Sequence, residues 1–398
     1  RIMIMANNNE NKILNVPNLR FPEFCGEWVT KSINDLAVVI GGGTPDTTVK
    51  SYWDGEIQWF TPSEIGKNKY VDSSLRTITE VGLNNSSAKL LPPNTILLSS
   101  RATIGECSLS LRECATNQGF QCLVSKKCNV DFLYYLIQTK KKDLIRKSCG
   151  STFLEISANE VRKIQVSVPS DVEQQKIAEL LSLIDERIAT QNKIIEKYES
   201  LIKGLNNILL YGTEGKYVCL GDILLERSER SRTNNQHEVL SSTVKGIFSQ
   251  REYFSKDIAS ENNVGYKIIR LHDVVLSPQN LWMGNINYND RFDIGIVSPS
   301  YKVFSIADGY DNQFVAAMLK TYRALYSYMM VSEQGASIVR RNLNMEAFLQ
   351  LVFKIPSLDK QREIGYTISL LKYQLKTANK IIRAYISQKK YLLRQMFI

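Results

Sequence analysis

The stretch Ile177–Leu209, IAELLSLIDERIATQNKIIEKYESLIKGLNNIL, decides the fold of this chain. Its apolar side chains recur in steps that alternate between four and three residues, and the one polar interruption is Gln191. The seam consists of Ile177, Leu181, Ile184, Ile188, Ile195, Tyr198, Ile202, Leu205 and Leu209. This heptad period keeps one apolar stripe against a partner helix as the two helices supercoil. The stretch therefore predicts a long coiled-coil helix.

The same seam recurs 187 residues later, near the end of the sequence. The repeated positions are Ile364, Ile368, Leu371, Leu375, Ala378, Ile382, Tyr385, Lys389, Leu392 and Met396. Identities at this offset include Pro169/Pro356, Ser170/Ser357, Gln174/Gln361, Asn192/Asn379, Lys193/Lys380, Ile194/Ile381, Ile195/Ile382 and Lys203/Lys390. An ungapped register of this length indicates an internal repeat.

The two helices are expected to pack on each other in antiparallel orientation, because a short connection cannot join parallel helices this long. Residues 169–212 carry five basic and seven acidic side chains, whereas residues 356–398 carry nine basic and two acidic ones. Opposite charges favour this pairing. We expect Gln191 to face the region of Ile382 and Lys389 to face that of Ile184, in a rod of about 50–60 Å. The alternative is that each helix belongs to an ordinary bundle in its own domain.

Composition bounds the class of protein. The chain has 398 residues, a formal net charge of +10 and a pI near 9.1, which favour a polyanionic partner. No apolar run approaches the length of a membrane span. Seven cysteines at irregular spacing, with no CxxC pair, suggest neither a disulfide framework nor a zinc site, so we expect reduced thiols and a cytoplasmic location.

Two globular parts alternate with the two long helices. We expect an α+β fold with this organisation: a loose N-terminal arm at 1–15, a globular domain at 16–168, a long helix at 169–212, a second globular domain at 213–355 and a second long helix at 356–398. Patterning predicts strands at Ile57–Phe60, Thr95–Ser100, Phe120–Val124, Glu238–Ser241, Asp273–Ser277 and Tyr301–Ser305. It predicts amphipathic helices at Val130–Ile145 and Gln313–Met330.

Several motifs resemble the specificity subunit of type I restriction-modification systems. They are Asn15–Trp28 (NVPNLRFPEFCGEW), Gly43–Ile65 with IQWFTPSEI, Thr77–Gly105, and the helix openings PSDVEQQKIAELLSLID and PSLDKQREIGYTISLL. The second globular part keeps Tyr266–Ser277 and Val297–Phe304 but has no equivalent of TPSEI. The resemblance covers nearly the whole chain beyond the arm.

The resemblance implies two target-recognition domains that each read one half of a split site in double-stranded DNA. It implies that the helix pair sets the gap between the half-sites and docks two methyltransferase subunits. S-adenosylmethionine, ATP and magnesium would then be bound by the partner methyltransferase and restriction/translocase subunits, and none by this chain. Methylation would be of adenine at N6.

Motifs for catalysis are not found. A phosphate-binding GxxxxGK[ST] is absent, Gly41–Gly43 lacks the GxGxxG frame, and the one Pro-Pro pair lies in a turn rather than in a methyltransferase motif. His237 and His272 stand far apart in the sequence, so neither a metal site nor a general base is indicated. We expect a recognition protein and not an enzyme.

The expected DNA contacts are polar and basic side chains on loops, because base edges are read by paired donors and acceptors. In the first globular part they are Thr44, Lys50, Tyr52, Gln58, Thr61, Ser63, Lys67, Lys69, Arg101 and Thr103. In the second they are Ser241, Ser242, Lys245, Gln250, Arg251, Gln279, Asn280, Arg340 and Arg341. Core packing is the alternative for Trp53 and Trp59, and a solvated loop is the alternative for Lys67 and Lys69.

Two other functions stay open at this point. The chain could be a structural scaffold whose helix pair separates two protein-binding domains. It could also be a DNA enzyme whose site follows no familiar motif. Salt-sensitive binding to duplex DNA separates the first alternative from DNA reading, and modification of DNA without partners would support the second.

Overall fold

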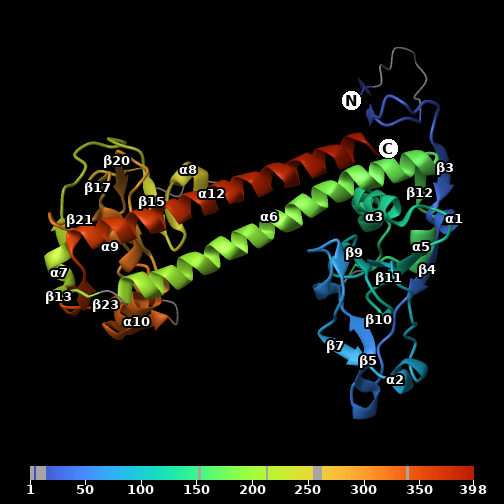
Figure 1. Cartoon of the computed structure of the whole chain (residues 1–398), viewed down its shortest axis with the longest axis horizontal. Helices are drawn as coiled ribbons and strands as arrows, with labels where there is room; N and C mark the ends of the chain where they lie inside the picture. Colours follow the sequence, from blue (N-terminus) through green and yellow to red (C-terminus); the bar gives the residue numbers. More distant parts are fainter. Residues whose placement is uncertain (1–3, 6–14, 151–153, 212–213, 254–261, 338–339) are drawn as a thin grey trace. The chain divides into compact units, whose positions relative to one another are not determined.

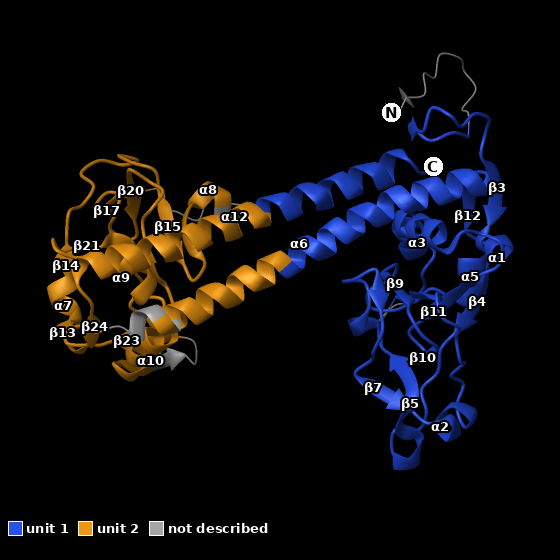
Figure 2. Ribbon diagram, viewed as in Figure 1, with its two compact units in different colours: residues 1–193, 380–398 blue, residues 194–379 orange. Residues whose placement is uncertain are grey.

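The computed structural model describes residues 4–5, 15–150, 154–211, 214–253, 262–337 and 340–398. The chain forms two compact units (Figure 2): unit 1 comprises residues 1–193 and 380–398, and unit 2 comprises residues 194–379. The predicted N-terminal arm lies mostly outside the described residues, as does the predicted boundary at 212–213. The predicted domain limits therefore stay predictions.

Two long helices dominate the fold (Figure 1). Helix α6 spans Asp171–Tyr211 and helix α12 spans Leu358–Gln395, with 41 and 38 residues. Among the described residues, no helix combines the length and the apolar character needed to cross a membrane. The α+β fold with two long helices is confirmed.

The predicted heptad seam is the buried face of both helices. Every seam position from Ile177 to Leu205 and from Ile364 to Met396 is buried or half-buried, whereas most residues between them are exposed. In unit 1, Asp185 of α6 pairs with Lys389 of α12, and Arg187 lies over the ring of Tyr385. Partners thus descend along one helix as they ascend along the other, so the helices are antiparallel in this unit.

The 187-residue repeat extends beyond the helices into a frame of short elements. In unit 1 the frame consists of β3 (Val29–Ser32), α1 (Ile33–Leu36), β4 (Ala37–Gly41), α5 (Ala158–Arg162) and β12 (Gln165–Val168). In unit 2 it consists of β13 (Lys216–Cys219), α7 (Leu220–Ile223), β14 (Leu224–Arg227), α11 (Met345–Leu349) and β24 (Val352–Ile355). Strand β3 pairs with β12 as β13 pairs with β24, in the same antiparallel register. The duplication therefore holds at the level of backbone hydrogen bonds.

A buried glutamine joins each long helix to its unit. Gln174 donates to the carbonyl oxygen of Pro169 at 3.0 Å, and its own oxygen accepts from the backbone N–H of Asn129, the N-cap of α3 (Val130–Thr139). Gln361 does the same with Pro356 at 3.0 Å. Its oxygen accepts at 2.9 Å from the N–H of the N-cap residue of α9 (Asn312–Met318). The frame fixes the helix starts by the same contacts twice.

Unit 1 contains a five-stranded sheet in the order β4-β11-β8-β9-β6 and a three-stranded sheet in the order β10-β5-β7. The strands are β5 (Trp53–Phe60), β6 (Tyr70–Val71), β7 (Arg76–Ile78), β8 (Ile96–Leu98), β9 (Cys107–Ser110), β10 (Cys114–Thr116) and β11 (Gln121–Ser125). Strands β1 (Ile4–Met5) and β2 (Leu19–Arg20) pair separately. Short helical segments complete the unit: η1 (Lys50–Tyr52), η2 (Pro62–Glu64), α2 (Glu80–Asn84) and α4 (Lys141–Arg146). Its main core joins the sheet and α3 to the seams of both long helices.

Unit 2 repeats the central strand order as β14-β21-β18-β19. Its strands are β18 (Val274–Leu276), β19 (Ile286–Tyr288) and β21 (Lys302–Ile306), with the pairs β15 (Leu240–Thr243) with β16 (Gly246–Ser249), β17 (Lys267–Arg270) with β20 (Ile294–Val297), and β22 (Ser332–Ser337) with β23 (Arg340–Leu343). Its further helical segments are α8 (Gln250–Tyr253), η3 (Leu281–Met283) and α10 (Tyr322–Met330). Its core joins the sheet, α9 and α10 to α12.

Five of the six predicted strands are confirmed within two residues at each end, and the sixth, Ile57–Phe60, ends as predicted but begins four residues earlier, at Trp53 of β5. The two amphipathic helices were wrong in one respect, because each is broken into two. The first breaks at Lys140, between α3 and α4. The second breaks around Thr321, whose backbone is extended and whose side chain accepts from the N–H of Ala324 to cap α10. A helical period continues across such a break, so patterning alone does not show it.

Candidate nucleic-acid interface

The predicted contact segments of unit 1 meet around one loop, Thr116–Gly119. The N–H of Gly43 donates to Thr116 at 2.8 Å, and the N–H of Ser100 donates to Gly119 at 2.8 Å. The N–H of Asn117 donates to the carbonyl oxygen of Phe60 at 3.1 Å. The segments that carry Thr44, Thr61 and Arg101 are therefore neighbours, although they lie far apart in the sequence.

The two tryptophans form the core of the small sheet. Trp53 and Trp59 are buried, with ring centroids 5.1 Å apart in an edge-to-face arrangement. The indole N–H of Trp59 donates to the carbonyl oxygen of Gly43 at 2.9 Å. Core packing is thus the correct interpretation for both. The guanidinium of Arg76 lies 3.5 Å from the ring centre of Trp53 and is an exposed cation that the sequence analysis missed.

The predicted contacts on and around the three-stranded sheet β10-β5-β7 are of two kinds: side chains that are exposed, and side chains that already bond or pack within the chain. Lys50, Ser63 and Lys67 are exposed and stay available for DNA. Gln58 accepts from the N–H of Ser74 at 2.7 Å. The other three are half-buried: Thr44 bonds Gln118, Thr61 bonds Glu64 at 2.6 Å in the cap of η2, and Tyr52 packs against the tryptophan core.

The prediction that Lys69 lies on a solvated loop or contacts phosphate is corrected by the structure. Its side chain is only 6% exposed and forms a 2.6 Å ion pair with Asp131. Its ammonium also donates to the hydroxyl of Ser182 on α6 at 2.7 Å and lies 5.0 Å from the ring centre of Tyr135. Lys69 fastens the sheet to the long helix, because an unpaired buried ammonium would cost more than it gains.

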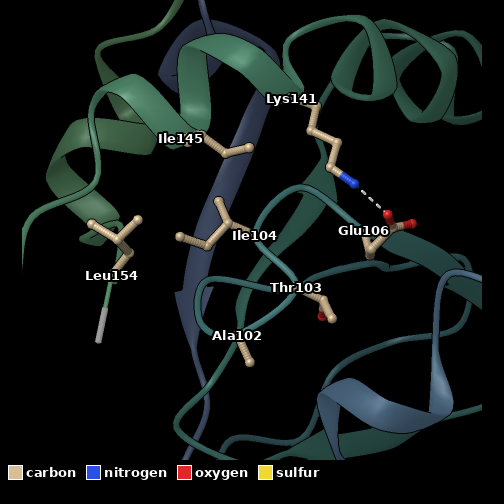
Figure 3. A pocket seen from close by; sticks show the side chains of 7 residues that line it. All are labelled: Ala102, Thr103, Ile104, Glu106, Lys141, Ile145 and Leu154. Carbon is tan, nitrogen blue, oxygen red and sulfur yellow. Dashed lines mark hydrogen bonds and ion pairs between the residues drawn. The ribbon is translucent and has the colours of Figure 1, made fainter. Parts of the chain in front are cut away.

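The loop that follows β8 is the second candidate surface of unit 1 (Figure 3). It forms one side of a groove of about 580 Å³ whose other side is α4. The groove is lined by Ala102, Thr103, Ile104, Glu106, Lys141, Ile145 and Leu154. Arg101 at the start of the loop forms a 2.8 Å ion pair with Glu155, and Thr103 is exposed. Ala102 has a positive φ of 53°, a backbone conformation that residues other than glycine rarely adopt. Residues in such conformations cluster at functional sites.

Lys141 is a groove residue that the sequence analysis missed. It forms an ion pair with Glu106 across the groove, as Figure 3 shows. The sequence placed it in a run of lysines outside an amphipathic helix. The break at Lys140 turns α4, and with it Lys141, toward the loop.

In unit 2 the predicted contact segment Ser241–Arg251 folds as the hairpin β15–β16. Lys245 is exposed in its turn, and Arg251 is exposed just after it. Ser241 and Ser242 are buried, which corrects their prediction as DNA contacts. Gln250 is half-buried and donates to the hydroxyl of Ser241 at 3.3 Å.

A buried polar network holds this hairpin on the sheet. Ser242 donates to Asn285 at 2.8 Å and accepts from Asn287 at 2.7 Å. The oxygen of Asn287 in turn accepts from the ammonium of Lys320 at 2.6 Å. Desolvation of the amine, together with the positive charge of Lys372, lowers the pKa of Lys320 to about 8. These bonds satisfy the polar groups and give the hairpin one fixed orientation.

The second predicted segment of unit 2 follows β18, the strand equivalent to β8 in the shared strand order. Gln279 is exposed, and its carbonyl oxygen accepts from the N–H of Arg341 at 3.1 Å. This pairing parallels the bridge between Arg101 and Glu155 in unit 1. The predicted equivalence of Arg101 with Gln279 and Asn280 thus agrees with the topology.

Arg340 and Arg341 differ in their surroundings. Arg340 is exposed, whereas Arg341 is half-buried and donates to the carbonyl oxygen of Met329 at 3.0 Å. Asn280 is half-buried and precedes η3. Arg340 is therefore the better placed of the two arginines for phosphate.

No group of His, Cys, Asp or Glu side chains within the described residues is placed to hold a metal ion. His272 lies in a turn with a φ of 74°, and its Nδ1 is 2.5 Å from the hydroxyl of Tyr288. The arrangement supplies donors, cations and rigid loops for recognition. DNA contact by any one of these side chains stays a prediction.

Comparison with known proteins finds a likeness over residues 26–200. Residues 26–200 match the family model described as the type I restriction modification DNA specificity domain. The MjaIX type I restriction enzyme specificity subunit of Methanocaldococcus jannaschii is 40% identical over 179 residues, which are 43% of this chain and 41% of that protein. The EcoR124I/EcoR124II specificity subunit of Escherichia coli is 31% identical over 175 residues, 42% of this chain and 43% of that protein.

A solved structure extends the likeness in fold. The type I restriction-modification S subunit from M. genitalium superposes with a TM-score of 0.60 at 16% identity, over 96% of this chain and 99% of that chain. The fold is thus shared over nearly the full length. The curated relatives are matched over only about two-fifths of their own length.

Proposed function

We propose that this chain, whose residues 26–200 match the family model described as the type I restriction modification DNA specificity domain, is the sequence-reading subunit of a type I restriction-modification complex. The observation that carries the proposal is the exact recurrence of the frame around two different sets of loops. A duplicated frame holds β8 and β18, and the loops after them, in equivalent places. A protein that reads two different half-sites needs this combination of a repeated frame and loops that differ between the two units.

Each unit would read one half of a split site in double-stranded DNA. In unit 1 the exposed candidates are Lys50, Ser63, Lys67 and Thr103, with Arg101 and Lys141 at the groove. In unit 2 they are Lys245, Arg251, Gln279 and Arg340. Cations among them would bind phosphates and fix the position of the chain on the duplex, while the polar side chains would contact base edges.

The helix pair would set the number of unread base pairs between the half-sites. Its heptad seam makes it stiff, and the polar pair of Asp185 and Lys389 fixes the register of the two helices. The length of the pair would then enter the recognised sequence as a spacer, although the helices contact few bases.

Two methyltransferase subunits would dock on this chain, one for each copy of the frame. Large apolar side chains stay exposed on both long helices, including Val172 and Leu183 on α6 and Tyr366 and Tyr373 on α12. Exposed apolar side chains of this size are typical of surfaces that bind another protein. The chemistry, with S-adenosylmethionine, ATP and magnesium, would reside on the methyltransferase and restriction/translocase partners, and the complex would act in the cytoplasm, on DNA.

Sequencing of adenine methylation in cells with and without the gene tests the proposal. The expected result is a split motif that is methylated only when the gene is present. Methylomes that are identical with and without the gene, in cells that express the partner subunits, would contradict it.

A further inference from the structure

Two ion pairs bracket the groove loop of unit 1, the loop Arg101–Glu106. Arg101 is paired with Glu155 at 2.8 Å, and Glu106 is paired with Lys141 of α4. All four side chains are between 37% and 44% exposed. Ion pairs with this much access to solvent contribute little to stability. Another anion of suitable shape can therefore replace either carboxylate at little cost.

The backbone of the loop, and not only the carboxylates, places the two cations. Gly105 has a φ of 85°, and a Cβ at this position would lie 2.8 Å from Cγ of Lys141. The stem of Lys141 therefore passes directly over the loop. The carbonyl oxygen of Arg101 accepts from the hydroxyl of Ser99 at 2.8 Å, and its backbone pairs with that of Glu155. Arg101 and Lys141 would thus keep their places after their partners leave.

The guanidinium of Arg101 has donors to spare. Its ion pair with Glu155 is at Nε, a buried atom that forms no hydrogen bond, and within the described residues no hydrogen bond involves its two terminal nitrogens. A guanidinium presents five N–H donors in a planar fork that matches carboxylate and phosphate equally well. A phosphate can approach the open side before the carboxylate departs, so exchange needs no bare cation.

We propose that Glu106 and Glu155 are stand-ins for DNA phosphates. In the free chain they hold Lys141 and Arg101 in the orientation that two backbone phosphates take over on binding. The inference rests on the proposed function, because it assigns a regulatory role to the same surface. Before binding, the four side chains of the two ion pairs carry no net charge, which weakens their attraction to arbitrary duplex DNA. Phosphates replace the carboxylates only where further contacts to the DNA offset the loss of the two ion pairs.

Neutral variants of the two carboxylates test the proposal. Glu106→Gln and Glu155→Gln keep the side-chain shape and free one cation each. We expect each variant, in the complex of the full chain with its methyltransferase subunits, to bind non-specific duplex DNA about tenfold more tightly and with a steeper salt dependence. The gain at the cognate site should be smaller. Glu106→Ala and Glu155→Ser provide second variants if a glutamine impairs folding.

Asp72→Asn is the matched control, because Asp72 is exposed, lies in the same unit and is ion-paired with Arg112 at 2.6 Å. An equal gain in the control and in the groove variants would overturn the proposal, since it would show only a general effect of charge. Retention of the Glu155→Gln gain in an Arg101→Ala background would overturn it as well. A wild-type complex that binds no DNA would instead contradict the proposed function, so the two failures are distinguishable.

Discussion

Lys389 of α12 forms a 2.7 Å ion pair with Asp185 of α6. Asp185 also accepts from the hydroxyl of Tyr135 at 2.7 Å, so one carboxylate joins α3, α6 and α12. Both partners of the ion pair are less than 20% exposed. The lysine occupies a seam position where the heptad pattern calls for an apolar residue, and the aspartate is what makes it acceptable there.

Replacing this aspartate is expected to weaken unit 1. Asp185→Ala leaves the half-buried ammonium of Lys389 and the hydroxyl of Tyr135 without their acceptor, which should lower the free energy of unfolding by about 1–3 kcal/mol. Urea denaturation of the full chain measures it. The exposed neighbour Glu186 provides the control, because Glu186→Ala should change the free energy of unfolding by less than about 0.5 kcal/mol. Equal effects of the two substitutions would show that the ion pair contributes nothing.

Lys67 and Lys69 are two residues apart and should respond in opposite ways to substitution. Lys67 is exposed, so Lys67→Ala should weaken DNA binding by the assembled complex and reduce the salt slope by about one, with little effect on Tm. Lys69→Ala should lower Tm, because it breaks the ion pair with Asp131, with a smaller effect on DNA affinity. Fluorescence anisotropy at several salt concentrations and thermal melts separate the two. The reverse pattern would show that burial misidentifies the DNA-facing lysine.

The helix pair offers a test of the spacer. Inserting one heptad after Gln191 and one after Ile382 preserves both seams and lengthens each helix by about 10 Å. The unread spacer in the methylated motif should grow by about three base pairs. A four-residue insertion after Gln191 alone shifts one seam and should abolish activity or change the spacer. An unchanged spacer with full activity in the double insertion would refute the proposal that the helix pair sets the spacer length.

The polar network under the β15–β16 hairpin predicts a dependence of stability on pH. The pKa of Lys320 is lowered to about 8 in the folded chain by desolvation and by Lys372. The unfolded amine keeps its proton to about pH 10.4, so between these values the unfolded state binds more protons and stability rises with pH. The wild-type chain should therefore gain stability relative to Lys320→Met from pH 7.5 to pH 9.5. A constant difference in urea midpoints over this range would contradict the shift.

Thiol reactivity should follow burial. Cys25 and Cys149 are exposed, whereas burial raises the pKa of Cys107, Cys114 and Cys122 to about 12. A thiol in that state holds little thiolate at neutral pH. Maleimide should therefore modify Cys25 and Cys149 first in the native chain, as mass spectrometry of timed digests can show. Early labelling of Cys122 would mean that its sheet opens readily.

The heptad seam was predictable because the residues that contact the partner helix in a coiled coil recur at one fixed spacing in the sequence. The positions that follow this period, from Ile177 to Leu205 and from Ile364 to Met396, are buried or half-buried in the structure. The fates of Lys69, Ser241 and Ser242 were not predictable, because their partners lie far away in the sequence: Asp131 and Ser182 for the lysine, and Asn285 and Asn287 for Ser242. Composition marks a polar residue as a candidate, but only the fold shows whether another residue already uses it.

The groove contains the opposite case, a residue that the sequence did not single out as a candidate. Lys141 belongs to a run of three lysines that reads as a solvated face, and no local signal distinguishes it. The break at Lys140 and the glycine at position 105 together bring it to the loop. A positive φ at Ala102 is likewise invisible in the sequence, since alanine favours no such conformation.

The frame occurs twice, at an offset of 187 residues, and this bears on how the proposed specificity could change. Its strands and helix starts align residue for residue in the two units, while the segments enclosed between β4 and α5, and between β14 and α11, have diverged. Genetic exchange at the frame would exchange an enclosed segment as a block without disturbing a register or a helix cap. If the chain reads a split site as proposed, it could acquire a new half of its target sequence in a single recombination event, whereas the point mutations that would otherwise be needed must each preserve the fold.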